Sequence, residues 1–233
     1  MQKRKGNYRS QRIRKPTPNE EAKKYIKMGL IVLAVVTVIA GTVKLVQSNV
    51  FRSKEYTEKT GDKIDQSRPD IDVQLLTVNS YSRPGTETNR ITGIVIHYTA
   101  NPEASAQANR DYFEGLKDTR TTQASSHFIV GLDGEIIQCI PTWEIAYASN
   151  SRNNDTVSIE CCHPDETGEF NGKTYESVVE LTAWLCLKFD LDEKDVIRHY
   201  DVSGKNCPKH FVENEDAWDQ FHKDVKKQLK KIK

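Results

Sequence analysis

The sequence has too few cysteines for a disulfide framework. Only five occur among 233 residues. Dense disulfide networks belong to small secreted domains that cannot build a sufficient core, and this chain is long enough to build one. Because the number is odd, at least one thiol is left for another role, while a disulfide among the others stays open. The five are Cys139, Cys161, Cys162, Cys186 and Cys207.

The chain also has almost no net charge, +1, but this value is the sum of two oppositely charged parts. Residues 1–50 contain 11 Lys and Arg against two acidic residues, whereas the remainder contains 23 against 31. A basic arm alone could indicate nucleic-acid binding. Its position before an uncharged run favours a membrane-flanking role, so we expect no nucleic-acid partner.

Charge is absent from residues 28–43. If Lys44 reaches the interface, the apolar run extends to residue 46, about the 20 residues that a bilayer-spanning helix needs. The run lacks the 3.6-residue alternation of an amphipathic core helix. Lys and Arg crowd its N-terminal side, which predicts that residues 1–27 form a cytoplasmic arm and that the rest is exported.

A cleaved signal peptide is the alternative, because the VIA triplet (residues 38–40) before Gly41 resembles a small-residue cleavage site. A basic lead of 27 residues is long for a signal peptide. We therefore expect an uncleaved signal anchor and a single-pass protein of the cell membrane, with its N-terminus cytoplasmic and its folded domain extracytoplasmic.

The rest of the chain divides into a linker and one domain. Residues 47–70 are charged and lack apolar periodicity, as in a linker, and no internal repeat is present. Strands are predicted at three runs rich in β-branched residues and in a hairpin: 91–97, 156–162, 195–200 and 125–140. Helices are predicted where apolar residues recur at helical spacing: 105–116, 175–190 and 217–233. This alternation predicts an α/β domain over residues 71–233, with a single mixed β-sheet flanked by helices.

One short stretch, VIRHYDVSGKNCP (residues 196–208), places His199 and Cys207 around a Ser-Gly turn. Imidazole and thiolate are zinc ligands, and a catalytic zinc has three protein ligands and an open fourth position. His97 ends another apolar strand and is the candidate third ligand. Each residue alone is more often structural, because a strand-end histidine usually belongs to a packed edge and a cysteine before proline is usually buried.

Together with other segments, these residues resemble a known family. The segments are GIVIHYTA (93–100), SSHFIVGLDGEIIQCIP (125–141), SIE (158–160) and RHYDVSGKNCP (198–208). In this order they resemble the zinc-dependent N-acetylmuramoyl-L-alanine amidases, which include phage lysins, bacterial autolysins and peptidoglycan recognition proteins. The resemblance covers about residues 71–222. It implies hydrolysis of the amide bond between N-acetylmuramic acid and L-alanine in peptidoglycan.

The resemblance also implies the metal and the proton carrier. His97, His199 and Cys207 are expected to bind Zn²⁺, which lowers the pKa of its water and polarises the amide carbonyl. Glu160 matches the family's catalytic acid and would pass a proton from water to the leaving amine. Without the family match, Glu160 would be interpreted as a carboxylate at a solvated strand edge.

Two further residues receive roles from the resemblance. Lys205 would face the oxyanion that develops on the carbonyl oxygen; alone it would be one more surface lysine. His127 matches a recurrent histidine and would line the substrate cleft. The remaining histidines, His163, His210 and His222, match no functional position and are expected at the surface.

The chain departs from the family at two places. Many relatives have a Trp-His pair where this chain has Tyr147 and Ala148, so we expect a different grip on the substrate. Glu160 is followed by Cys161, Cys162 and His163, a possible second metal patch. We discount it because adjacent cysteines on a strand point to opposite faces.

Three other functions are compared with the amidase. A peptidoglycan-binding module that has lost zinc usually lacks the cysteine ligand, and here Cys207 and Glu160 are both present. A thiol nucleophile, Cys207 with His199 as base, leaves His97 and Glu160 unexplained. A cytoplasmic cell-wall-recycling amidase conflicts with the anchor. The expected partners are therefore peptidoglycan and, through one N-terminal helix, the membrane; no oligomeric state is predicted.

Overall fold

The computed structural model describes residues 63–233, together with residues 19, 23, 25, 27, 28, 30 and 37. The chain divides into two compact units, residues 1–59 and 60–233, and the second unit contains the folded domain. The expected arm (1–27), anchor (28–46) and most of the linker (47–70) lie almost entirely outside the described residues. Among the residues that are described, no helix is long and apolar enough to span a bilayer.

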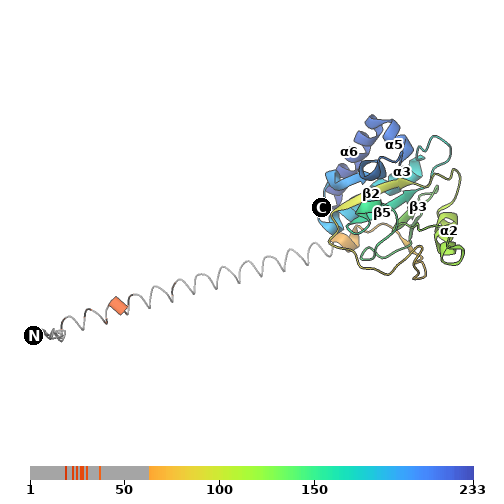
Figure 1. Ribbon diagram of the computed structural model, residues 1–233. Coiled ribbons are helices and arrows are strands. Elements are labelled where there is room, and N and C mark those ends of the chain that lie inside the picture. Colours follow the sequence, from red (N-terminus) through yellow and green to blue (C-terminus); the bar gives the residue numbers. More distant parts are fainter. Residues whose placement is uncertain are drawn as a thin grey trace, which may run out of the picture. The chain divides into compact units, whose positions relative to one another are not determined.

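One mixed sheet of six strands forms the centre of the domain (Figure 1), in the order β1-β4-β3-β5-β2-β6. The strands span Asp72–Val73 (β1), Gly93–Tyr98 (β2), Phe128–Val130 (β3), Ile136–Gln138 (β4), Thr156–Cys161 (β5) and Val196–Arg198 (β6). Strands β2, β3, β5 and β6 run parallel, and β4 returns antiparallel to β3 as a hairpin. The α/β class with a single mixed sheet and the hairpin at residues 125–140 are confirmed.

Helices flank this sheet, and local sequence sets where they begin. They span Ala106–Thr119 (α2), Gly172–Phe189 (α3), His199–Ser203 (α4), Lys209–Glu213 (α5) and Glu215–Ile232 (α6), with 3-10 turns at Asn150–Arg152 (η1) and Glu193–Asp195 (η2). Ser105 Oγ accepts the N–H of Ala108 at the start of α2, and the Asn171 side chain accepts the N–H of Thr174 at the start of α3. Such caps satisfy backbone donors that a helix start leaves unpaired.

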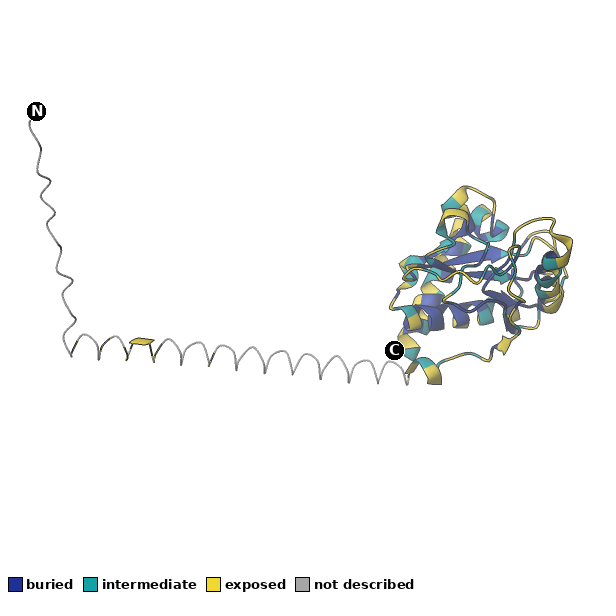
Figure 2. Ribbon diagram, turned by 60° about the horizontal axis from the view of Figure 1, so that its bottom comes forward, coloured by how far each residue is buried: buried dark blue, intermediate teal, exposed yellow. Residues whose placement is uncertain are grey.

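The first face of the sheet is covered by α3 and α6. Because side chains alternate along a strand, Ile94 and Ile96 of β2 point to this face and His97 points to the other. The central strands β2, β3 and β5 lie in the buried interior (Figure 2), whereas both residues of β1 are exposed. Full burial of each large apolar side chain stabilises the fold by about 1.5–3 kcal/mol. The helical side of this core includes Val178, Leu181, Leu185, Phe221, Val225 and Leu229.

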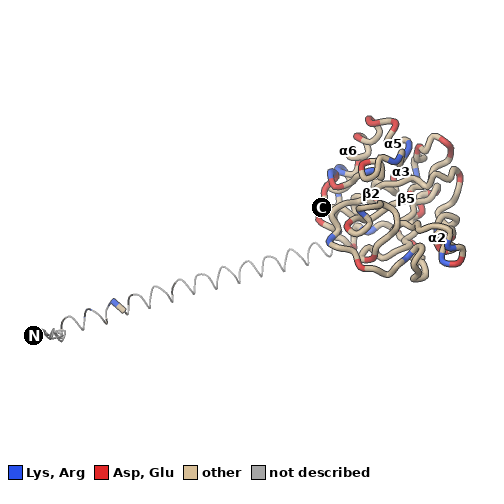
Figure 3. The backbone as a smooth tube through the Cα atoms, viewed as in Figure 1, with Lys and Arg blue, Asp and Glu red and all other residues tan. Residues whose placement is uncertain are grey.

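The second face has two different parts. Over β3 and β4 it packs against α2 through Phe113 and Leu116. Over the paired strands β2 and β5 it carries polar side chains instead, namely His97, Ser158 and Glu160. Elsewhere the charged residues lie mostly on helices and loops (Figure 3). The polar part of this face is where the candidate site lies.

Two predicted elements differ in detail from the structure. In the helix predicted at residues 105–116, the apolar spacing would put Tyr112 on the buried side with Phe113 and Leu116, but Tyr112 is 54% exposed. Phe113 and Leu116 define the buried stripe, and the next residue along a helix is turned about 100° away. The strand expected to reach Tyr200 ends at Arg198, because the Asp201 carboxylate accepts the Arg198 N–H at 2.8 Å and starts α4.

The cysteines and His163 settle two further expectations. Within residues 63–233 all five cysteines are free and buried. Cys161 packs in the core below α3 and Cys162 in the core below α2, which confirms that the adjacent pair points to opposite faces. His163 is only 2% exposed, so its expected surface position is wrong. Its Nδ1 lies 2.7 Å from the carbonyl of Asp165, which folds the chain over the ring.

Part of the expected linker also packs on the domain. Residues 63–66 form a helical turn. Ile64 contacts the first core, and its carbonyl accepts the indole N–H of Trp184 at 2.9 Å. The packed part of the chain therefore begins before residue 71.

Candidate metal centre

Three neighbouring parallel strands bring the candidate residues together at the carboxyl ends of the strands. β2 carries His97 and pairs with β5 so that Glu160 lies directly beside it. β6 pairs with the other side of β2 and leads into His199 at the start of α4. In open α/β sheets, ligands bind outside the carboxyl ends of the strands. The strand order thus joins residues that are far apart in the sequence.

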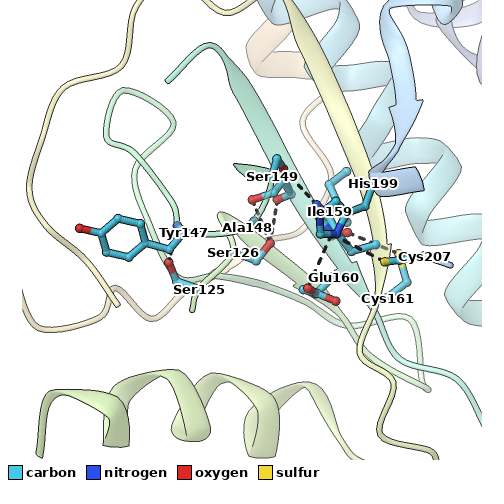
Figure 4. A network of polar contacts seen from close by, with 12 residues as sticks. Ser125, Ser126, Tyr147, Ala148, Ser149, Ile159, Glu160, Cys161, His199 and Cys207 are labelled. Carbon is cyan, nitrogen blue, oxygen red and sulfur yellow. Dashed lines mark hydrogen bonds and ion pairs between the residues drawn. The ribbon is translucent and has the colours of Figure 1, made fainter. Parts of the chain in front are cut away.

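The side chains of His97, His199 and Cys207 converge at these carboxyl ends. One ligand atom from each lies within 4.8 Å of the other two, and all three residues are buried. Cys207 Sγ is 3.8 Å from His97 Nδ1, and the two imidazole centroids are 4.7 Å apart. Figure 4 shows His199, Cys207 and Glu160 gathered at one point. Two imidazoles and a thiolate form a zinc ligand set that leaves a fourth position for water or substrate.

The hydrogen-bonding state of His199 fits a metal ion. Its Nε2 lies 2.6 Å from Asn150 Oδ1. Its Nδ1 is buried and has no hydrogen-bond partner among the described residues. Leaving such a buried polar atom unsatisfied costs about 1–3 kcal/mol. A coordinate bond from Nδ1 to a cation would remove this cost, so the residues present fit zinc.

Burial sets the protonation of the three groups. It lowers the pKa of His97 well below the ordinary value, with His199 adding to the effect, and it also lowers the pKa of His199. Both imidazoles are therefore neutral, the form that binds metal. Burial raises the pKa of the Cys207 thiol to about 12.

The raised pKa of Cys207 argues against a thiol nucleophile. Such a cysteine needs a depressed pKa so that the thiolate is populated near neutral pH. A coordinated cation, in contrast, deprotonates a thiol outright. The surroundings of Cys207 are those of a ligand.

Glu160 lies beside the ligands without belonging to their cluster. Its Oε1 is 4.0 Å from His97 Nδ1, and its Oε2 is buried without a partner in the described part of the chain. Burial raises the pKa of this carboxyl to about 8, and Lys205 acts in the opposite direction. A carboxyl that is both unpaired and next to the metal position can exchange a proton there.

A cleft of about 580 Å³ opens over these residues. This volume is within the range of small-molecule sites. His97, His199, Glu160 and Lys205 all line it. The other lining residues are Phe113, Gln123, Ala124, Ser125, Tyr147, Ala148, Asn150, Asn153 and Ser203. One wall therefore comes from α2 and its following loop, and another from residues 147–153.

The segment that departs from the family lies in the second wall. The Tyr147 ring points away from His199 and Glu160 (Figure 4), and its backbone N–H donates to Ser125 Oγ at 2.9 Å. Tyr147 and Ala148 both line the cleft. The difference from the family therefore changes a wall of the cleft and does not change the three candidate metal ligands.

His127 does not occupy the cleft-lining position expected for it. The residue is 1% exposed. Its Nδ1 accepts the Ser158 N–H at 3.0 Å, and its Nε2 lies 2.9 Å from the carbonyl of Glu144. Burial lowers its pKa to about 4. The ring is held between β5 and the carbonyl of Glu144, and it is not among the residues that line the cleft.

Two residues without a sequence signal contact the ligands directly. Ser149 Oγ lies 3.1 Å from His97 Nε2, and Asn150 Oδ1 lies 2.6 Å from His199 Nε2. They sit in a loop, and no spacing connects them to either histidine. The only sequence feature that could have drawn attention to Ser149 and Asn150 is their position directly after Tyr147 and Ala148, where the chain departs from its family.

Comparisons with known proteins agree with this geometry. The family model described as N-acetylmuramoyl-L-alanine amidase matches residues 87–210, just over half of the chain. The amidase CwlL of Bacillus licheniformis is 35% identical over 164 residues, which cover 65% of this chain and 45% of the relative. The amidase BlyA of Bacillus subtilis (strain 168) is 33% identical over 175 residues, 66% of this chain and 46% of the relative.

A solved structure supports the same assignment. A mutant endolysin from Bacillus subtilis superposes with a TM-score of 0.58 at 28% identity, covering 68% of this chain and 99% of that structure. The chain spans about half the length of the curated relatives it matches. On the family match, the sequence identity and the shared fold, this chain belongs to the N-acetylmuramoyl-L-alanine amidase family.

Proposed function

We propose that this chain hydrolyses the amide bond between N-acetylmuramic acid and L-alanine in peptidoglycan. The observation that carries the proposal is that two imidazoles and one unpaired carboxyl line a single cleft, with one buried thiol close to both imidazoles. The matched relatives are named N-acetylmuramoyl-L-alanine amidases. Hydrolysis of this bond consumes one water and yields a lactyl carboxylate on the glycan and a free amine on L-alanine.

His97, His199 and Cys207 would hold a zinc ion. When bound, zinc supplies a Lewis acid that polarises the amide carbonyl and lowers the pKa of water. The residues themselves fit this task, because both imidazoles are neutral and one buried nitrogen lacks a partner among the described residues. The same complete ligand set disfavours a binding module that has lost its metal.

Glu160 would move the proton. In its ionised form, which a cation bound at the neighbouring ligands would favour, the carboxylate would take a proton from the attacking water and return it to the nitrogen of the leaving amine. The side chain lines the cleft, and its Oε1 lies 4.0 Å from the nearest ligand nitrogen. Position and free hydrogen-bonding capacity therefore both suit a general acid–base residue.

Lys205 would stabilise the negative charge that develops on the carbonyl oxygen. It is an exposed residue that lines the cleft, two positions before Cys207. From there its ammonium group can reach a bound substrate and remains solvated when the cleft is empty.

We also propose that the enzyme is anchored in the cell membrane, with residues 1–27 cytoplasmic and the catalytic domain outside. The support is the uncharged run at residues 28–43 and the excess of Lys and Arg before it. Protease added to intact, wall-stripped cells should remove the C-terminal domain and spare an N-terminal tag. The reverse pattern would overturn the topology without affecting the chemistry.

Mass spectrometry of peptidoglycan digested by the purified protein tests the reaction. Amidase activity should release peptide stems with a free L-alanine amine and leave intact glycan strands. Glu160→Gln protein is the matched control, because it has the same shape and lacks the base. New reducing sugar ends, or cleavage within the stem peptide, would contradict the proposal.

A further inference from the structure

We propose that Ser149 and Asn150 are positioning residues that fix both imidazoles with Nδ1 turned toward the metal position. The inference rests on the proposed zinc site and assigns residues that lie outside its ligand set. The two contacts come from consecutive positions in one loop, Ser149 Oγ at 3.1 Å from His97 Nε2 and Asn150 Oδ1 at 2.6 Å from His199 Nε2. One short segment thus orients two ligands, one from β2 and one from the start of α4.

The chemistry of these contacts selects a ring tautomer. An amide oxygen only accepts hydrogen bonds, so His199 Nε2 must carry the proton that it donates to Asn150. Its Nδ1 then has a free lone pair, in agreement with its lack of a partner among the described residues. Which nitrogen of a histidine binds metal is set in this way by the hydrogen bond of the other nitrogen.

His97 follows the same arrangement. Its Nδ1 faces Cys207 Sγ at 3.8 Å and Glu160 Oε1 at 4.0 Å, which leaves Nε2 to donate to the Ser149 hydroxyl. Ser149 is 1% exposed, so water does not replace this contact. Ser149 is also the N-cap residue of η1, and its hydroxyl contacts His97 instead of capping the turn.

The loop is braced so that both side chains are held in place. Asn153 Oδ1 accepts the N–H groups of Ala148 at 3.1 Å and Ser149 at 2.6 Å. Thr156 Oγ1, at the start of β5, donates to the carbonyl of Arg152 at 2.6 Å. Because β5 also carries Glu160, the loop is fixed to the strand that borders the metal position.

The backbone of Asn150 makes a clean test possible. Its φ is +51°, in the left-handed region, where asparagine is better tolerated than most residues and glycine is unstrained. Asn150→Gly therefore removes the amide without straining the loop. Asn150→Asp keeps an acceptor oxygen at the same place. Arg120→Gly is the matched control, because Arg120 has φ +55° at the end of α2 and does not line the cleft.

The first measurement is zinc affinity by competition with a chromophoric chelator, using the full chain. Loss of an outer hydrogen bond to a ligand histidine typically weakens metal binding about 10–100-fold. We expect this loss in Asn150→Gly and a loss near the lower end in Ser149→Ala. Asn150→Asp and Arg120→Gly should bind zinc like the wild type. Equal affinity in Asn150→Gly and Arg120→Gly would overturn the inference.

The second measurement is the ring tautomer in metal-free protein, from long-range ¹⁵N–¹H correlations of the histidine side chains. In the wild type His97 and His199 should both carry hydrogen on Nε2. In Asn150→Gly the His199 ring should become a mixture of tautomers while His97 is unchanged. Hydrogen on Nδ1 of His199 in the wild type would contradict the inference.

The two measurements also separate this inference from the function on which it rests. A wild-type chain that binds no zinc would overturn the proposed function. The tautomers would then still show whether Ser149 and Asn150 orient the rings. Tight zinc binding that is insensitive to both substitutions would leave the function standing and remove the positioning role.

Discussion

Two buried histidines on the same face of the sheet differ in the groups that their ring nitrogens contact. His127 is 1% exposed, and both ring nitrogens are engaged, by Ser158 and by the carbonyl of Glu144. His97 is 2% exposed, and one nitrogen contacts Ser149 while the other faces Cys207 and Glu160 at 3.8 and 4.0 Å. Buried polar groups are normally fully hydrogen-bonded. Burial alone therefore does not separate the structural histidine from the functional one. The groups that face the ring do, because His97 faces a thiol and a carboxyl while His127 faces a backbone carbonyl and a backbone N–H.

The largest effect expected from this contrast is loss of the metal. His97→Ala or Cys207→Ala should lose zinc and activity together, because each removes one of three ligands. His127→Ala should keep its zinc. Metal analysis of the purified variants, and activity after strong chelation followed by added Zn²⁺, test this. Stoichiometric zinc in a His97→Ala, His199→Ala, Cys207→Ala triple variant would contradict the assignment of these residues as zinc ligands.

The next effect separates catalysis from metal binding. Glu160→Gln keeps size and hydrogen-bonding reach but loses basicity, so turnover should fall about 10²–10⁴-fold. Zinc content and peptidoglycan binding should stay close to wild type, because Glu160 is outside the ligand cluster. Initial rates on purified peptidoglycan provide the measurement. Near-normal turnover would mean that another group transfers the proton, and the zinc-site assignment would still stand.

Lys205→Ala should have a smaller effect. Removing one oxyanion partner costs on the order of 10²–10³-fold in turnover. Lys173→Ala is a suitable control, since Lys173 pairs with Asp133 at 2.9 Å and does not line the cleft. If both lysine variants retain full turnover, Lys205 takes no part in the chemistry.

The smallest effect on activity is expected at the saturated histidine. His127→Ala removes the acceptor for the Ser158 N–H, and an unpaired buried group costs about 1–3 kcal/mol of the free energy of unfolding. Turnover at low temperature and zinc stoichiometry should be retained. Urea unfolding of the zinc-loaded protein measures the loss. A His127→Ala protein of normal stability but low turnover would instead show that His127 acts on the substrate.

The sequence predicted what depends on strand ends and motif spacing. His97 is a candidate ligand from sequence because it ends an apolar strand, His199 and Cys207 because they lie close together around a turn, and the family resemblance joins all three. The resemblance implies that His127 lines the cleft, but the burial of its ring depends on a contact with the carbonyl of Glu144, which the neighbours of His127 in the sequence do not encode. Ser149 and Asn150 were missed for the same reason, since a loop is placed by tertiary contacts without periodicity.

His97 and Cys207 are 110 positions apart in the chain. An ion held by both would close a loop that contains β3, β4, β5 and α3, and a cross-link of this kind restricts the unfolded chain most when the loop is long. Ligand binding to the folded state adds about 4 kcal/mol of stability when free ligand is a thousandfold above Kd. The lifetime of the folded enzyme would then follow the zinc supply around it, and zinc-starved cells would lose the protein itself as well as its activity.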